Sequence, residues 1–189
     1  MGNIQQLIKE HEVIQSMLCL LEKLCDRLGQ EEDVEIKHLE QLVEFIQIYI
    51  GQNHHAKEEV ILFPALERSG VPREGGPICV MLMEHHMGKE YLVGMKGALE
   101  VYKNGVEKGM AQFVEHARNY ISLLHRHIDK ENQCLYPLAE QRLDPELLSG
   151  LEADFERLEI VTIGRGTAQK FESFIKELGE MYDVSEYRH

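Results

Sequence analysis

The sequence of 189 residues lacks several features that mark whole classes of protein. It has 20 lysines and arginines against 33 aspartates and glutamates, so its formal net charge is −13. Nucleic acids and anionic membranes are bound through a basic surface, and this charge balance argues against both kinds of partner. The sequence also has no run of 18 apolar residues, which argues against a transmembrane helix. We therefore expect no nucleic-acid partner and no membrane partner.

The beginning of the chain has no export signal. The first residues, MGNIQQLIKEHE, contain no basic region followed by an apolar one, which is the pattern of a secretory signal peptide. The chain is therefore expected in the cytoplasm, where thiols stay reduced. Its cysteines form no C-x-x-C pair, and free cysteine is most often buried. We expect four buried thiols, at Cys19, Cys25, Cys79 and Cys134.

Proline and strand-like alternation are both scarce, which predicts an all-α chain. Five prolines leave residues 1–63 and 78–136 uninterrupted. A first helix, capped by Asn3, is predicted to end near Gly29 because one apolar stripe with alternating spacings of four and three runs along it. That stripe consists of Leu7, His11, Ile14, Leu18, Leu21, Cys25 and Leu28.

Turn residues and helix caps delimit the remaining helices. The second is predicted from the acidic segment after Gln30 to about residue 67, the third over 77–104 and the fourth over 107–141. Helices of this length with short links predict an up-down-up-down four-helix bundle over residues 1–143. Residues 144–189 are predicted to form a short C-terminal helical extension packed on the bundle. It would have one helix from Asp144-Pro145, a break at 160–167, and a last helix ending near Met181 before fraying residues DVSEYRH.

An internal repeat links the second and fourth predicted helices. The first copy reads HHAKEEVILFP from His54, and the second reads HIDKENQCLYP from His127, 73 residues later. His, Lys, Glu, Leu and Pro coincide, and Phe is matched by Tyr. A shorter Glu-His pair recurs on the first and third helices, at Glu10-His11 and Glu84-His85. Duplicated cores reuse apolar residues, whereas His and Glu are unfavourable to bury unless they are paired or bind metal.

The spacing of the repeated residues predicts a metal site. His54 and Glu58 are four residues apart, on one helical face, and His127 and Glu131 repeat this spacing. All four lie on the inward stripes of their helices, as do the two histidines of the shorter pair. The predicted ligands are therefore four imidazoles and two carboxylates, contributed by all four helices: His11, His54, Glu58, His85, His127 and Glu131.

Two metal ions could share these ligands, because a carboxylate can bridge two cations. Mixed imidazole and carboxylate ligation with open positions favours non-haem iron over calcium or magnesium, with manganese and zinc as alternatives. A ferritin-like site would need two E-x-x-H motifs. Within the four predicted bundle helices only Glu35-Ile36-Lys37-His38 matches, so that class is rejected.

Other polar residues near the motifs have plainer interpretations. Adjacent or nearby histidines point away from the ligand direction in an α-helix, so we expect them on the surface or beside the ligands: His55, His86 and His125. His116 is expected at the end of the core or on the surface, and His38 and His189 are expected to be exposed. Tyr120 is interpreted as a core residue rather than a hydrogen-bond partner of the site. Glu10 and Glu84 either line a solvent or proton path or are surface carboxylates.

Over roughly residues 1–143 the chain resembles a bacterial hemerythrin-like (HHE cation-binding) domain. The resemblance rests on the N-terminal EH, HHAKEEVILFPALE, GGPICVMLMEHHMGKEY and HIDKENQCLYPLAEQ. It implies a four-helix bundle with a non-haem di-iron centre, ligated by the six residues above. It further implies that Glu58 and Glu131 bridge the two irons together with an oxo or hydroxo group.

The sequence departs from the oxygen-carrying hemerythrins at two ligand positions. Their second histidine on the third helix is replaced here by Lys89, and the fourth helix carries H-x-x-x-E in place of H-x-x-x-x-D. The pattern is closer to six-ligand members similar to the repair-of-iron-centres family, and fewer ligands leave more open positions. We expect the chain to bind or reduce O2, NO or peroxide, in a response to oxidative or nitrosative stress. The alternative is oxygen or NO sensing, or iron storage and delivery, without turnover. No rubredoxin-like or nucleotide motif is visible, so electrons would come from a separate, unknown reductant.

Overall fold

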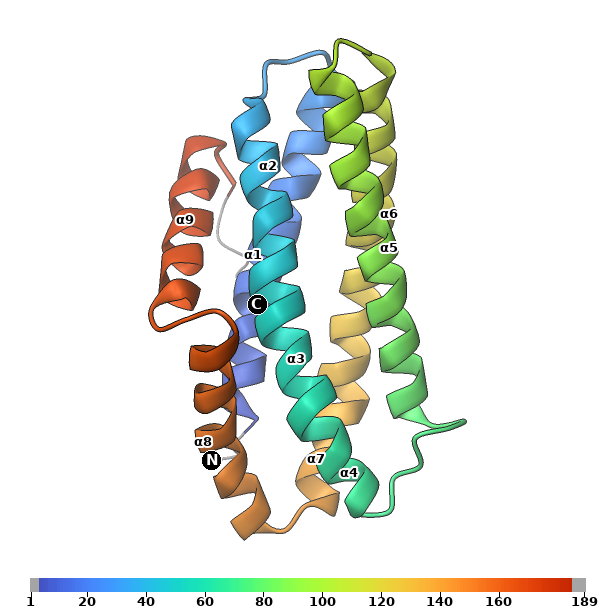
Figure 1. The fold of residues 1–189 in the computed structure, drawn as a ribbon, viewed down its shortest axis with the longest axis vertical. Helices are drawn as coiled ribbons and strands as arrows, with labels where there is room; N and C mark the ends of the chain where they lie inside the picture. Colours follow the sequence, from blue (N-terminus) through green and yellow to red (C-terminus); the bar gives the residue numbers. More distant parts are fainter. Residues whose placement is uncertain (1–3, 185–189) are drawn as a thin grey trace.

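The computed structural model describes residues 4–184 and shows a bundle of helices (Figure 1). Every regular element within this part is helical, as the sequence predicts. The expected cap Asn3, His189 and the end of the expected fraying segment lie outside the described residues. The second and fourth long helices of the bundle are each built from several consecutive helical segments, and we call them the second rod and the fourth rod. The second rod comprises α2 (Ile36–Phe45), η1 (Ile46–His54), α3 (His55–Lys57), η2 (Glu58–Leu62) and α4 (Phe63–Arg68), and the fourth rod comprises α6 (Lys108–Lys130), η3 (Glu131–Leu135) and α7 (Tyr136–Arg142).

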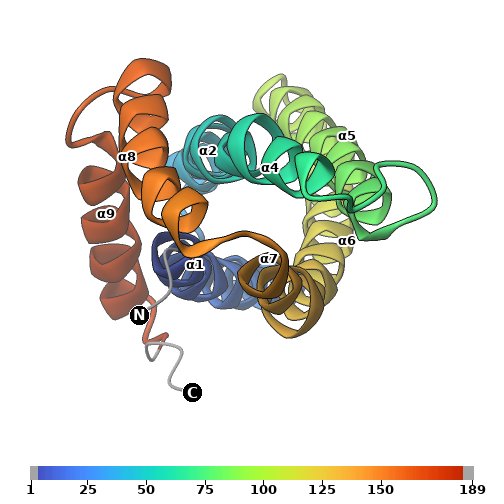
Figure 2. The same cartoon turned by 90° about the horizontal axis from the view of Figure 1, so that it is seen from below.

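The two rods and two single helices, α1 (Gln5–Gly29) and α5 (Pro77–Lys103), surround a common axis (Figure 2). Helices α8 (Pro145–Thr162) and α9 (Thr167–Met181) lie outside this ring. Helix α8 contacts η1, α3 and η2 of the second rod, and α9 contacts α1. The break between them is shorter than expected, and Gly164 and Gly166 adopt positive φ angles of 86° and 78° there. Across the described residues, none of the helices is both long and apolar enough to cross a membrane.

The two rods change from α-helical to π-helical geometry at equivalent points of the repeat. The N–H of Phe63 bonds to the carbonyl of Glu58, and the N–H of Tyr136 bonds to that of Glu131, each five residues back. A proline directly follows each of these turns. Because proline lacks an N–H and its ring clashes with the carbonyl four residues earlier, the wider turn lets the rod continue past it. Side chains in these stretches therefore depart from α-helical spacing, and such π-helical turns are frequent at functional sites.

The buried apolar side chains form two clusters, one towards each end of the bundle. One includes Leu18 and Phe45, and the other includes Leu7 and Phe63. On each rod and helix the predicted ligands lie between residues of the two clusters. The polar site therefore interrupts the core near its middle and is screened from solvent at both ends.

The prediction of four buried cysteines is wrong for most of them. Cys25 is buried in the core, Cys19 is half-buried, and Cys79 and Cys134 are exposed. Cys79 directly follows the buried Ile78 on α5, so helical rotation turns it outward. Free cysteine is commonly buried, but its position on the helix decides its exposure in a particular chain.

Candidate metal centre

The structure brings together all six predicted ligands inside the bundle. They come from α1, the second rod, α5 and the fourth rod, and none is more than 1% exposed. Four imidazoles and two carboxylates therefore meet where water is excluded. They are His11, His54, Glu58, His85, His127 and Glu131.

The imidazoles form two facing pairs. Nε2 of His11 lies 3.0 Å from Nε2 of His54, and Nε2 of His85 lies 3.2 Å from Nε2 of His127. We call the first pair the first half-site and the second pair the second half-site. Candidate ligand atoms gather around each, within 4.8 Å of one another, with Glu131 in the first group and Glu58 in the second.

The two carboxylates connect the half-sites. Oε2 of Glu131 lies 3.1 Å from Nε2 of His11, and its Oε1 lies 3.2 Å from Nε2 of His127. Oε2 of Glu58 lies 3.4 Å from Nε2 of His85 and 3.9 Å from Nε2 of His54. One carboxylate therefore reaches both imidazole pairs with separate oxygens, and the other lies between them, as bridging ligands do.

The carboxylate oxygens fit a bound cation. Oε2 of Glu58 and both oxygens of Glu131 are buried and have no hydrogen-bond partner among the described residues, although imidazole nitrogens lie close to them. Buried carboxylates without a partner are unfavourable. A cation placed among these atoms would satisfy them, and the mixture of nitrogen and oxygen donors suits iron, manganese or zinc.

The charges of the site perturb its pKa values strongly. Burial opposes ionisation of Glu131, but the charge of His127 and the nearby imidazole of His11 hold its pKa well below the usual range. Burial also lowers the pKa of His127, but Glu131 outweighs this and, with Glu84 and Glu58, raises it to about 10. Because metal ligands must be deprotonated, cation binding here would displace protons.

Two buried carboxylates accept hydrogen bonds from the Nδ1 atoms of His54 and His127, the predicted histidine ligands on the two rods. Nδ1 of His54 donates to Oε2 of Glu10 at 2.9 Å, and Lys57 bonds to the other oxygen of Glu10. In the second half-site Nδ1 of His127 donates to Oε2 of Glu84, also at 2.9 Å, and Lys130 bonds to the other oxygen. Glu10 and Glu84 are therefore not surface carboxylates. These contacts explain why Glu-His and H-x-x-K recur in the repeat.

The other two histidines are held in a similar way. Nδ1 of His11 donates to Oδ1 of Asn132 at 2.9 Å, and Nδ1 of His85 donates to Oε1 of Glu59 at 2.8 Å. Asn132 and Glu59 each directly follow one of the spanning carboxylates. All four Nδ1 atoms thus have an oxygen acceptor, which fixes the ring orientation and leaves Nε2 directed at the centre.

Tyr136 belongs to the site but was not predicted from the sequence. Its ring stacks on His11 at 5.3 Å, and its hydroxyl donates to Oε1 of Glu58 at 2.8 Å and lies 3.2 Å from Nε2 of His11. Phe63, the matching residue of the other copy, stacks on His85 at 5.9 Å. The Phe-to-Tyr difference within the repeat was the available signal, because it adds one hydroxyl to an otherwise duplicated site.

The structure places His55 beside the ligands, which is one of the two positions expected for it. It is buried, its ring stacks on His85 at 3.8 Å, and it joins the candidate ligand group of the second half-site. Its Nε2 has no hydrogen-bond partner among the described residues. The residue directly follows the π-helical segment η1, whose turns depart from α-helical spacing. His86 and His125 are exposed and half-exposed, in agreement with the sequence analysis.

His38 is also wrongly predicted as exposed. It is 8% exposed, because the end of α9 covers it and Nδ1 of His38 lies 2.8 Å from the hydroxyl of Tyr182. Tyr120 is a core residue, as expected, and His116 is half-buried. The side chain of Lys89 is 57% exposed, and its Nζ lies 3.4 Å from Glu59, which holds His85.

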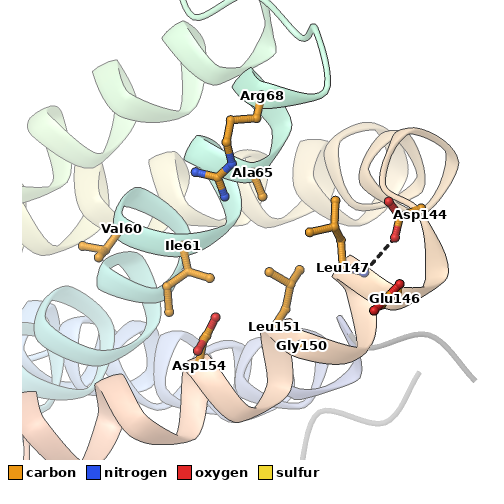
Figure 3. Close-up of a pocket in the computed structure, with 10 residues that line it drawn as sticks. All are labelled: Val60, Ile61, Ala65, Arg68, Asp144, Glu146, Leu147, Gly150, Leu151 and Asp154. Atoms are coloured by element: carbon orange, nitrogen blue, oxygen red, sulfur yellow. Dashed lines mark hydrogen bonds between the residues drawn. The ribbon is translucent and has the colours of Figure 1, made fainter.

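The surface has a groove of about 520 Å³ that is separate from this centre (Figure 3). It lies between the end of the second rod and the start of α8. Ile61 and Leu151 lie on its two sides, with Arg68 and Asp144 towards its polar end. None of its lining residues is a predicted ligand. The candidate centre is thus an enclosed polar cluster inside the bundle rather than a surface pocket.

One comparison with known proteins gives a match. A family model described as the hemerythrin HHE cation-binding domain matches residues 3–139. This range contains every residue of both half-sites. No curated protein and no solved structure matches the chain.

Proposed function

Because the chain belongs to the hemerythrin HHE cation-binding domain family, we propose that it is an up-down-up-down bundle that holds two iron ions. The observation that carries this proposal is the placement of Glu131, whose two oxygens lie 3.1 Å and 3.2 Å from imidazoles of different half-sites. A single cation would need only one of these imidazole pairs. A carboxylate that spans both pairs suits two cations.

In this proposal each half-site holds one iron. His11 and His54 would bind the first and His85 and His127 the second, with Glu58 and Glu131 shared between them. Manganese and zinc are the competing ions, since both accept these donors.

We propose that the centre binds or reduces a small ligand, O2, NO or peroxide, in the cytoplasm. The two irons, when bound, would supply one-electron redox chemistry and open coordination positions, with electrons from a separate reductant. The apolar clusters keep bulk water out, and the hydroxyl of Tyr136 holds one oxygen of Glu58. The unpartnered Nε2 of His55 lies beside the second half-site, where it can donate a hydrogen bond to a small ligand.

Metal analysis of the protein from iron-replete cells tests the first part. We expect about two irons per chain. One tightly bound zinc, with no iron, would contradict the proposal. A variant that replaces the exposed Glu140 with glutamine serves as a control for surface carboxylates, and its iron content should equal that of the wild type.

Optical spectra of the reduced protein, before and after addition of O2, NO or peroxide, test the second part. New absorption bands on mixing would identify the ligand that binds. Unchanged spectra with all three ligands, in a protein that holds two irons, would limit the function to iron storage or delivery.

A further inference from the structure

Lys57 is a fully buried cation that links the first half-site to α8. Its side chain is 0% exposed, and its Nζ bonds to Oε1 of Glu10. It also lies 2.7 Å from Oε2 of Glu159, a residue of α8 outside the bundle ring. Nε2 of Gln6 lies 3.3 Å from the same oxygen. A chain of contacts thus runs from Glu159 through Lys57 and Glu10 to the imidazole of His54.

The second half-site has no such link among the described residues. Lys130 occupies the position equivalent to Lys57 and bonds to Glu84, the equivalent of Glu10. Its side chain, however, is 43% exposed, and it has no second carboxylate partner within the described part of the chain. Helix α8 packs on the rod that carries Lys57, through contacts with η1, α3 and η2.

We propose that Glu159 is a positioning residue for the first half-site, so that the two metal positions are unequal. This inference rests on the metal site proposed above. Glu159 holds Lys57 in place, Lys57 holds Glu10, and Glu10 fixes the ring of His54. The first position is therefore covered by α8, and the second has no such cover over its lysine, Lys130, among the described residues.

The physical reason is that a buried ammonium group is stable only with partners of opposite charge close to it. A charge removed from water needs close partners, and loss of one partner of a buried ion pair leaves an uncompensated charge. Without Glu159, Lys57 would keep only Glu10 and would turn towards water. A polar hollow of about 600 Å³, lined by Gln6, Glu159 and Arg165 among others, lies directly outside and offers that water. Glu10 would then lose the contact that orients it towards His54.

Removal of metal by a chelator tests the inequality. We expect wild-type protein to release its two metals in two phases of similar amplitude, one slow and one fast. In Glu159→Ala the slow phase should accelerate about tenfold, because partners that orient metal ligands are worth about 10- to 100-fold in metal affinity. The fast phase should not change. Glu159→Asp should restore part of the slow phase, and Glu156→Ala, an exposed residue of the same helix, should leave both phases as in the wild type.

A second readout does not need bound metal. In NMR spectra of the metal-free protein with ¹⁵N-labelled histidine, the Nδ1–H signal of His54 should shift or broaden in Glu159→Ala. The corresponding signal of His127 should remain unchanged. If Glu159→Ala does not fold, Glu159→Gln, which keeps the size of the side chain, takes its place. Equal changes at both histidines, or at neither, would overturn the inference. Failure to find two metals in the wild type would instead refute the proposed function, and the histidine signals would still decide the role of Glu159.

Discussion

Replacing Tyr136 by phenylalanine isolates one hydroxyl of the candidate centre. The ring should keep its stacking on His11, because Phe63 packs on His85 in the same way in the other half-site. Burial, together with Glu131 and Glu58, raises the pKa of Tyr136, so its hydroxyl stays protonated and donates to Oε1 of Glu58 at 2.8 Å. The variant would leave this buried oxygen without its donor.

A hydrogen bond to a charged group contributes about 1.5 to 3 kcal/mol. We expect Tyr136→Phe to lower the free energy of unfolding of the metal-free protein by this amount. For a chain of this size the melting temperature would fall by about 3 to 12 °C. Denaturant titration and thermal melts measure both quantities. Tyr120→Phe is the control, because Tyr120 is equally buried but belongs to the apolar core. Equal stability of Tyr136→Phe and wild type, or an equal loss in the control, would refute the reasoning.

Three further predictions concern the same centre. Glu131→Gln should lose at least one metal, because an amide is a poor bridge, and full occupancy in metal analysis would remove Glu131 from the ligands. His55→Phe should keep both metals and the stacking on His85, but should speed dissociation of NO or O2 in stopped-flow mixing; loss of metal would show that His55 is itself a ligand. The pKa of His127 is about 10 when folded, above its ordinary 6.5, so its contribution to stability is complete below pH 6.5 and is lost as pH rises towards 10. The denaturation midpoint of the metal-free protein should therefore decrease as the pH is raised from 6.5 to 9. The midpoint of the metal-loaded protein should increase over the same range, since metal binding releases protons. Parallel curves for the two forms would contradict this.

The helices could be predicted from the sequence because their limits depend on local chemistry. Pro77 and Pro145 begin helices in the structure as expected, and Gly29 ends the first one. These residues act through their own backbone preferences, which require no knowledge of the surrounding fold. The six predicted ligands, which the structure brings together inside the bundle, could be selected for a related reason, since repeated His and Glu residues at helical spacing have few structural explanations.

What the sequence analysis misplaced or left open depends on distant parts of the chain or on the exact course of a helix. His55 was expected either on the surface or beside the ligands, and the structure places it beside the ligands, directly after the π-helical segment η1. His38 is buried by Tyr182, which lies 144 residues later. Lys57, for which the sequence analysis made no prediction of exposure, is buried because α8 covers it. Such contacts arise only when the extension packs on the bundle.

The departures from the repeat, rather than the repeat itself, distinguish the two half-sites. The duplicated residues give each half-site two imidazoles, an orienting carboxylate and a lysine. In the first half-site the Tyr136 hydroxyl lies 3.2 Å from Nε2 of His11, and α8 covers the lysine, so the imidazoles there are closely surrounded. In the second half-site Nε2 of His55 has no hydrogen-bond partner among the described residues, and Lys130 is partly exposed. If a small ligand enters from solvent, we therefore expect it to approach on this less covered side, where Nε2 of His55 has no partner among the described residues.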